Sequence, residues 1–367
     1  MPYIYTEVVY LYSLTAPKLI IMYALLFLLT VSDWFLTIYF TIKFSLHPIY
    51  FFLFLIIRLC IPSIMKYFFQ HKFTIIYPKW LIQIGLILLS FSYLVLLLND
   101  YFFVSALIFY IGLTIAQQGF WAGASTFAVN NNTDQLNNVL NGIKNVGFVT
   151  GLIFACFFEK DTLSFFIVIV FVLVVMIAFL SFKQYSNDSI IIKYRKNRMH
   201  FFKYIVALSL VFISTIDYYL VFLIMKEYEL SAIVFILCLF VSVLAIPFAE
   251  KYIYKVHFKI NTILFFLIFL GGYIGLLVSK NAVILIVINF FISFSFVVLI
   301  NYFLQLMTEE EWEDYFYFSQ WFMWGGLVFI GFGNLLLNIK ILFALVIGIG
   351  LLIVIVSETK KSNLLPK

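Results

Sequence analysis

The sequence predicts an all-α integral membrane protein, with twelve transmembrane helices in two six-helix bundles related by a pseudo-two-fold axis along the membrane normal. The first observation is composition: 65% of the 367 residues are hydrophobic and 11% are charged, too few charges to cover a water-facing surface. The second is that the apolar runs are long enough for spans of ~20 residues. The third is internal repetition, because the two halves share features at matching positions.

Short polar breaks separate the apolar runs, and no soluble domain fits between them. The predicted spans cover residues 18–43, 47–66, 79–98, 101–129, 138–158, 163–183, 204–226, 231–249, 260–279, 281–306, 316–338 and 340–357. The longest break is polar and basic. It divides the chain into an N-terminal bundle (1–183), a cytoplasmic central loop (184–203) and a C-terminal bundle (204–367).

The distribution of Lys and Arg predicts the orientation, because these residues resist translocation across the membrane. They concentrate in alternate breaks, which places both termini in the cytoplasm of a multi-pass protein of the cell (inner or plasma) membrane. The net charge of +6 is therefore an orientation signal, and we expect the lipid bilayer and no nucleic acid as a partner. Nothing in the sequence calls for an oligomer, so we expect a monomer.

The repeat is clearest at an acid and at a basic break. Asp33 in the first span and Asp217 in the seventh lie 184 residues apart, each followed by aromatic residues and then by a Lys. Lys66 and Lys251, in the breaks after the second and eighth spans, lie 185 residues apart, and a Tyr follows each. Two matches at nearly one offset indicate a duplicated six-helix unit.

Two short motifs connect this architecture to a known family. The stretch IPFAEKYIYKVHFK at 246–259 carries Ala249, Glu250, Lys251 and Lys255 in the order of a GxLaDRxGRK signature, and IAQQGFWAGA at 115–124 is similar to an RxxQG signature. With twelve predicted spans, both termini in the cytoplasm and a long central loop, the chain resembles the major facilitator superfamily. GFVTGLIFA at 147–155 resembles the fifth-span pattern of its exporters, although it lacks the Pro and the second Gly pair.

The resemblance implies alternating access and a central cavity lined by the first and seventh spans. Asp33 and Asp217 would then face that cavity, where a carboxylate can carry a proton. Arg58 in the second span is the basic residue placed deepest in a predicted span. Two interpretations stay open: Arg58 tunes a titrating Asp33, or the two form a pair that only fastens two helices together.

Other polar and aromatic residues inside the spans are candidates for the same cavity. They can contact a substrate or tie helices together, and helix tying is the better default. One or two acids among aromatic rings suit an amphipathic, cationic substrate. These candidates are Gln117, Gln118, Trp121, Asn301 and Gln320.

Charged residues in the breaks predict an ionic latch at the inner face. The break TEEEWED at 308–314 is acidic, and it lies at the same face as the basic break after the eighth span. A solvated acidic loop is the plainer alternative. The latch candidates are Lys66, Glu250, Lys251, Lys255, Glu309, Glu310 and Glu311.

Together these features predict a secondary active transporter that exports an amphipathic small molecule in exchange for protons. We expect no enzyme activity, no cofactor and no metal site. Two alternatives remain: an immunity or sensor protein that keeps the fold without transport, and a membrane-embedded transferase acting on lipid-linked substrates. The transferase needs paired acids or histidines at a membrane face, and His47, His71, His200 and His257 are isolated.

Overall fold

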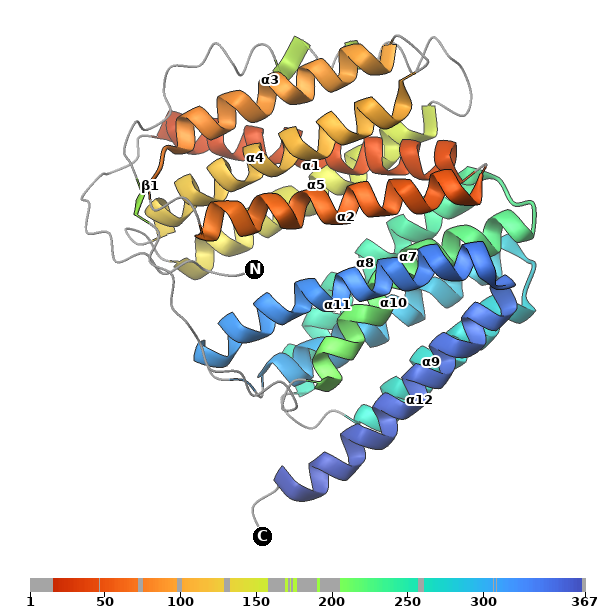
Figure 1. Ribbon diagram of the computed structural model, residues 1–367. Helices are drawn as coiled ribbons and strands as arrows, with labels where there is room; N and C mark the ends of the chain where they lie inside the picture. Colours follow the sequence, from red (N-terminus) through yellow and green to blue (C-terminus); the bar gives the residue numbers. More distant parts are fainter. Residues whose placement is uncertain are drawn as a thin grey trace. The chain divides into compact units, whose positions relative to one another are not determined.

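The structure is a computed structural model that describes residues 16–45, 47–71, 75–97, 101–128, 133–157, 169–170, 172, 174–176, 190–191, 205–256, 261–305, 307 and 309–364. The chain divides between Lys196 and Asn197 into two compact units. Almost all of the described chain is helical (Figure 1). The exceptions are turns and the two-residue strands β1 (Ile75–Ile76) and β2 (Ile190–Ile191).

Five helices of the N-terminal unit have assigned bounds, and each coincides with a predicted span to within a few residues. They are α1 (Ala16–Phe44), α2 (Pro48–His71), α3 (Pro78–Leu97), α4 (Phe102–Ala128) and α5 (Thr133–Phe157). The predicted span 163–183 lies largely outside the described residues. Strand β2, which lies in the predicted central loop, pairs with strand β1 in the connection between α2 and α3. The loop and this connection therefore lie at the same face, as the sequence predicts.

Six helices of the C-terminal unit have assigned bounds. They are α7 (Ile205–Glu227), α8 (Ala232–Val256), α9 (Thr262–Val278), α10 (Ala282–Gln305), α11 (Glu309–Leu336) and α12 (Ile339–Leu364). Asparagines start three of them: Asn261 accepts a hydrogen bond from the Leu264 amide, Asn281 from the Val283 amide, and Asn338 from the Lys340 amide. These side chains satisfy amides that the first turn of a helix leaves unpaired.

Seven of the described helices are long and apolar enough to cross a membrane, and four more carry shorter apolar stretches. The protein is therefore a multi-pass membrane protein. The number of twelve spans stays a prediction.

Three helix ends correct the predicted boundaries. Helix α2 runs to His71, α8 runs to Val256, and α11 begins at Glu309, so charged residues assigned to breaks lie within helices. The predicted break at 308–314 is wrong as a boundary, because its residues from Glu309 onward form the first turns of α11. Glu and Lys are good helix formers, and acids at the start of a helix and cations at its end complement the helix dipole.

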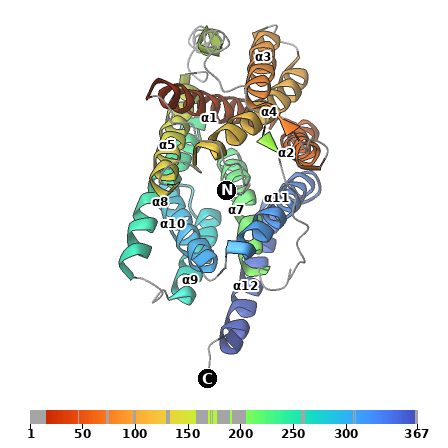
Figure 2. The same ribbon diagram turned by 90° about the vertical axis from the view of Figure 1, so that its left-hand side faces the viewer.

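The two units share one pattern of helix packing. In the N-terminal unit α1 packs on α2, α4 and α5, and α4 packs on α2 and α3. In the C-terminal unit α7 packs on α8, α10 and α11, and α10 packs on α8 and α9. Each N-terminal pair thus recurs six helices later, and Figures 1 and 2 both show α3 alongside α4.

A proline in the second helix of each unit extends the repeat. Pro62 lies inside α2 and Pro247 lies inside α8, 185 residues later, the same offset as Lys66 and Lys251. A proline inside a helix removes one backbone hydrogen bond and favours a kink. The second helix of each unit therefore departs from regular hydrogen bonding at equivalent residues.

Glycines bring helices into close contact in both units. A Cβ atom added at Gly151 of α5 would lie 2.9 Å from the Val31 carbonyl oxygen of α1, and one at Gly326 of α11 would lie 2.9 Å from the Phe212 carbonyl oxygen of α7. Gly147 also faces α1, with Thr30 Cβ at 3.0 Å. Small residues allow such approach where lipid supplies no hydrophobic drive for helix association. The glycines of the exporter-like stretch therefore serve helix packing.

Candidate functional site

The first candidate acid, Asp33, lies in α1 and has hydrogen-bonding neighbours within its own unit. Its side chain is half-buried. The hydroxyl of Thr37, one turn later, donates to Asp33 Oδ1 at 3.3 Å, and Thr37 Oγ1 also lies 3.0 Å from the Tyr110 hydroxyl of α4. Thr37 and Tyr110 are buried. Asp33 therefore belongs to a short polar chain that links α1 to α4.

Arg58 supplies a positive charge to this site. It is half-buried in α2, and its guanidinium lies within electrostatic range of the Asp33 carboxylate. The structure thus brings together the two residues that the sequence offered as a pair. That the pair tunes a titrating acid, or that it fastens α1 to α2, are two predictions that substitution of both residues distinguishes.

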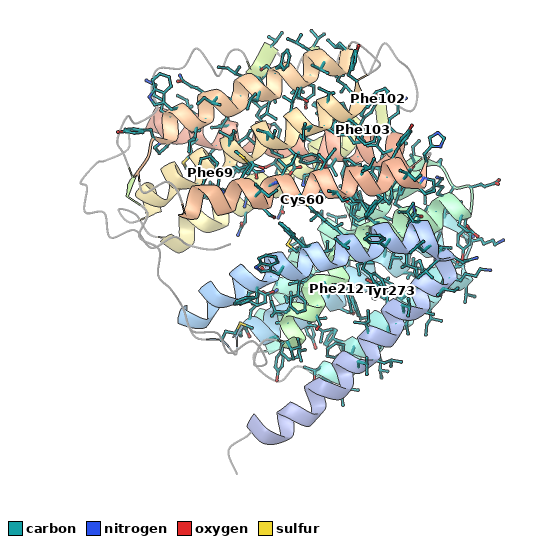
Figure 3. All side chains as sticks on the ribbon, in the orientation of Figure 1. Cys60, Phe69, Phe102, Phe103, Phe212 and Tyr273 are labelled. Carbon is teal, nitrogen blue, oxygen red and sulfur yellow. The ribbon has the colours of Figure 1, made fainter. Side chains whose placement is uncertain are left out.

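Asp217, the second candidate acid, lies at the corresponding place in α7 with different neighbours. Its side chain is half-buried, and its Oδ1 atom is sealed from solvent without a hydrogen-bond partner among the described residues. The Tyr273 hydroxyl of α9 faces the carboxylate, and the Cys238 thiol of α8 lies within electrostatic range. Figure 3 labels Tyr273 among the packed side chains of the C-terminal unit. A tyrosine hydroxyl and a cysteine thiol are both neutral groups at pH 7.

The remaining cavity candidates divide into described and undescribed side chains. Gln117 and Gln118 are half-buried in α4. The amide of Asn301 donates to the Val297 carbonyl oxygen of its own helix at 2.9 Å, which uses one of its two donor hydrogens. The side chain of Gln320 lies outside the described residues.

The ring of Trp121 contacts a lysine that was not predicted from the sequence to lie near the cavity. The Lys144 ammonium group of α5 lies 4.2 Å from the centroid of the Trp121 ring of α4, within cation–π range. Helix α5 begins at Thr133, so Lys144 lies about three turns into it. The predicted start at 138 placed this lysine close to the membrane face.

The tyrosines near the two acids were not predicted from the sequence as part of the site. Tyr93 of α3 lies beside Ser32 and within electrostatic range of Asp33, as Tyr273 lies beside Asp217. Thr37 could have been found, because residues four apart share a helix face. The tyrosines lie in the third helix of each unit, and they have no local signal in a chain with 24 Tyr and 47 Phe.

Other buried polar groups tie helices together. The Asn289 amide of α10 donates to the Cys238 carbonyl oxygen of α8 at 2.8 Å and to Ser242 Oγ at 2.6 Å. In the N-terminal unit, Ser92 of α3 and Ser105 of α4 donate to each other's carbonyl oxygens at 2.8 and 3.0 Å. These contacts match the expectation that most intramembrane amides and hydroxyls link helices.

The inner-face latch stays a prediction. Glu250 and Lys251 are exposed near the end of α8. The side chains of Lys66, Lys255, Glu309, Glu310 and Glu311 lie outside the described residues.

Comparison with known proteins bears on the fold. No family model matches the sequence, and no curated protein matches it significantly. Among the solved structures that are similar to this chain, two align over nearly their whole length. A point mutant of the nucleoside transporter NupG aligns with a TM-score of 0.60 and 11% identity over 92% of this chain and 97% of its own. A bacterial metal transporter aligns with a TM-score of 0.64 and 14% identity over 94% and 98%.

The chain has a major-facilitator-like fold. The resemblance drawn from the motifs is thus confirmed at the level of fold. Both of these neighbours are transporters. At these identities the likeness does not extend to their substrates.

Proposed function

We propose that the protein is a secondary active transporter that exports an amphipathic, cationic small molecule in exchange for protons. The observation that carries the proposal is one carboxylate in the first helix of each packing-equivalent unit, Asp33 in α1 and Asp217 in α7. An ionisable side chain inside a membrane span is unfavourable there, so it normally serves an ion or substrate pathway.

The proposed arrangement is the one expected from the sequence. Residues 1–183 and 204–367 form two six-helix bundles related by a pseudo-two-fold axis, joined by a cytoplasmic loop at 184–203. Both termini face the cytoplasm, and the protein acts as a monomer in the cell membrane. Alternating access exposes the two acids first to one side and then to the other.

The surroundings of the acids support a cationic substrate with apolar surface. Trp34 follows Asp33, is half-buried, and packs edge-on against Phe148 with ring centroids 4.2 Å apart. Gln117 and Gln118 offer amides, and the Trp121 ring already faces the Lys144 ammonium group. A carboxylate and aromatic faces together favour an organic cation.

Transport in proteoliposomes tests this function. Vesicles containing the full chain receive an imposed pH gradient, and uptake of ethidium, an amphipathic organic cation, is followed by fluorescence. We expect uptake that a protonophore abolishes and that protein-free vesicles lack. The matched control is the variant with Asp33→Asn and Asp217→Asn together, which keeps side-chain size and removes both titrating groups.

Two outcomes would count against the proposal. Uptake that persists with both acids replaced would exclude the carboxylates as coupling groups. No gradient-driven uptake of ethidium or of a panel of related cations would favour a non-transporting immunity or sensor protein with the same fold.

A further inference from the structure

Each unit buries one tyrosine of its third helix within electrostatic range of the acid of its first helix. Tyr93 of α3 and Tyr273 of α9 both have fully buried side chains, with 0% of their surface exposed. Neither hydroxyl has a hydrogen-bond partner among the described residues. Tyr93 lies within electrostatic range of Asp33, and Tyr273 faces Asp217. A buried tyrosine of the third helix near the acid of the first helix thus recurs in both units, but the neighbours differ: Tyr273 faces its acid, while Tyr93 lies beside Ser32.

The geometry is sharpest at Asp217. The Tyr273 hydroxyl faces the Asp217 carboxylate. This hydroxyl and Asp217 Oδ1 are both sealed from solvent, and both lack a hydrogen bond within the described part of the chain. Buried oxygens without partners are rare because they lose the hydrogen bonds that water would supply. A small rotation that joins this pair would satisfy both atoms.

Few other titratable groups face this carboxylate. Among the described residues, Tyr273 of α9 and Cys238 of α8 act on the Asp217 carboxylate. On α7 itself, Tyr218 packs edge-on against Phe235, with ring centroids 5.3 Å apart, and Tyr219 is buried. Tyr273 is therefore the group placed to respond to the charge of Asp217.

A tyrosine hydroxyl suits both protonation states of a carboxyl group because it is donor and acceptor at once. When Asp217 is ionised, the Tyr273 O–H can donate to the carboxylate. When Asp217 is protonated, its own O–H can donate to the Tyr273 oxygen. Only the orientation of the tyrosine hydroxyl changes, and the tyrosine stays neutral throughout.

We propose that Tyr273 is the hydrogen-bond partner that positions Asp217 for proton exchange, and that Tyr93, which lies beside Ser32, acts on Asp33 more weakly and from a greater distance. Asp217 takes one proton from water on one side of the membrane, forming a carboxyl O–H bond, and returns that proton to water on the other side. The half-buried Asp217 side chain exposes part of its surface while Oδ1 stays beside Tyr273. The inference rests on the proposed proton coupling.

The test follows protonation directly and needs no substrate. Dicyclohexylcarbodiimide enters membranes and reacts with protonated carboxyl groups. The full chain in lipid vesicles is treated with this reagent over a range of pH, and mass spectrometry of peptides reports labelling at Asp33 and Asp217 separately. The measured quantity is the pH at which labelling of each carboxyl falls to half.

We expect Tyr273→Phe to raise the labelling midpoint of Asp217 by about one pH unit and to leave that of Asp33 unchanged. The phenol hydrogen bond favours the ionised carboxylate, so its loss lets Asp217 hold the proton to higher pH. Tyr93→Phe should raise the midpoint of Asp33 by less, because Thr37 and Arg58 still act on that carboxylate. Tyr302→Phe, which removes a half-buried hydroxyl in α10, is the matched control and should move neither midpoint.

The outcomes separate this inference from the proposed function. An unchanged Asp217 midpoint in a folded Tyr273→Phe protein, or no labelling of wild-type Asp217 at any pH, would overturn the role of Tyr273 whether or not ethidium is transported. If Tyr273→Phe does not fold, the Tyr93→Phe titration decides, and an unchanged Asp33 midpoint would overturn the repeated pair. A shifted midpoint without ethidium transport would keep the pair and count against the proposed substrate class.

Discussion

Asp33 and Asp217 lie in equivalent helices of the two units, yet their neighbours differ. Asp33 accepts a hydrogen bond from Thr37 and lies within range of the positive Arg58. Asp217 has an Oδ1 atom without a partner among the described residues and faces the neutral groups Tyr273 and Cys238. The ionised form of Asp33 is thus stabilised by a hydrogen bond and a positive charge, whereas Asp217, at the matching place in the repeat, has neutral neighbours among the described residues.

The difference assigns unequal roles to the two acids. A carboxylate held by a cation and a hydroxyl gains stability from staying ionised, so it can fasten helices. A carboxylate beside neutral groups in an apolar interior has little to hold its charge, so a proton or a cationic substrate neutralises it readily. We therefore infer that Asp217 carries more of the coupling and Asp33 more of the stability.

The largest expected effect follows from replacing Asp217. Asp217→Asn keeps the size of the side chain and removes its titration, so gradient-driven uptake of ethidium should fall to the level of protein-free vesicles. The midpoint of thermal unfolding in detergent should stay unchanged or rise, because the groups that surround Asp217 among the described residues are neutral. Gradient-driven uptake at the wild-type rate in this variant would reverse the inferred roles.

The next effect concerns Asp33 and Arg58. Either Asp33→Asn or Arg58→Gln leaves one charge without the other and should lower the free energy of unfolding by about 2 kcal/mol. This is less than the roughly 3–5 kcal/mol of a fully buried pair, because both side chains are half-buried. The double variant should recover most of the loss, which denaturant unfolding in detergent can measure.

Transport by the double variant decides what the pair does. If gradient-driven uptake persists with both residues neutral, Asp33 is a helix fastener and does not carry protons. If uptake is lost while stability recovers, Asp33 shares the coupling with Asp217. Losses that simply add in the double variant would show that the two residues do not interact.

The third prediction tests whether the two units are equivalent in packing. Gly151→Ala places a methyl group 2.9 Å from the Val31 carbonyl oxygen, and Gly326→Ala places one 2.9 Å from the Phe212 carbonyl oxygen. Each change should lower unfolding stability by about 1–3 kcal/mol, because backbone atoms must move apart. Gly142→Ala is the control: nothing lies within 4 Å of the added carbon, and helix propensity favours Ala by up to ~1 kcal/mol. A loss at only one of the two sites would break the equivalence.

Most of the fold could be predicted from the sequence because lipid forces apolar residues into long runs. Eleven predicted spans coincide with described helices. The ends of α2, α8 and α11 could not be predicted from hydropathy, because these helices continue through charged residues such as Lys251 and Glu310. Hydropathy reports where the apolar stretch ends, while helix propensity and dipole effects set where the helix ends.

The candidate site could be predicted only where residues are rare. Asp33, Arg58 and Asp217 stand out because charges are scarce inside apolar runs. Tyr93 and Tyr273 do not stand out, since aromatic residues make up 21% of the chain. Their importance depends on which helices pack together, and α3 and α9 are distant in sequence from the acids that they face.

The smallest expected effect concerns the latch, whose acidic candidates all lie in the C-terminal unit. Glu309, Glu310 and Glu311 begin α11, and Lys251 and Lys255 lie near the end of α8. Pairs of this kind at a water-facing surface contribute under ~1 kcal/mol, so replacing all three acids by Gln should change the rate of ethidium transport by less than about fivefold. Because salt screens such pairs, the change should shrink further at high ionic strength.

Exchanging the charges, with Lys in place of the acids and Glu in place of both lysines, should restore the wild-type rate if the groups attract one another in one conformation. An unchanged rate in the Gln variant would show that the first turns of α11 carry solvated charges only, and the two units would then differ in their acids and not in a latch.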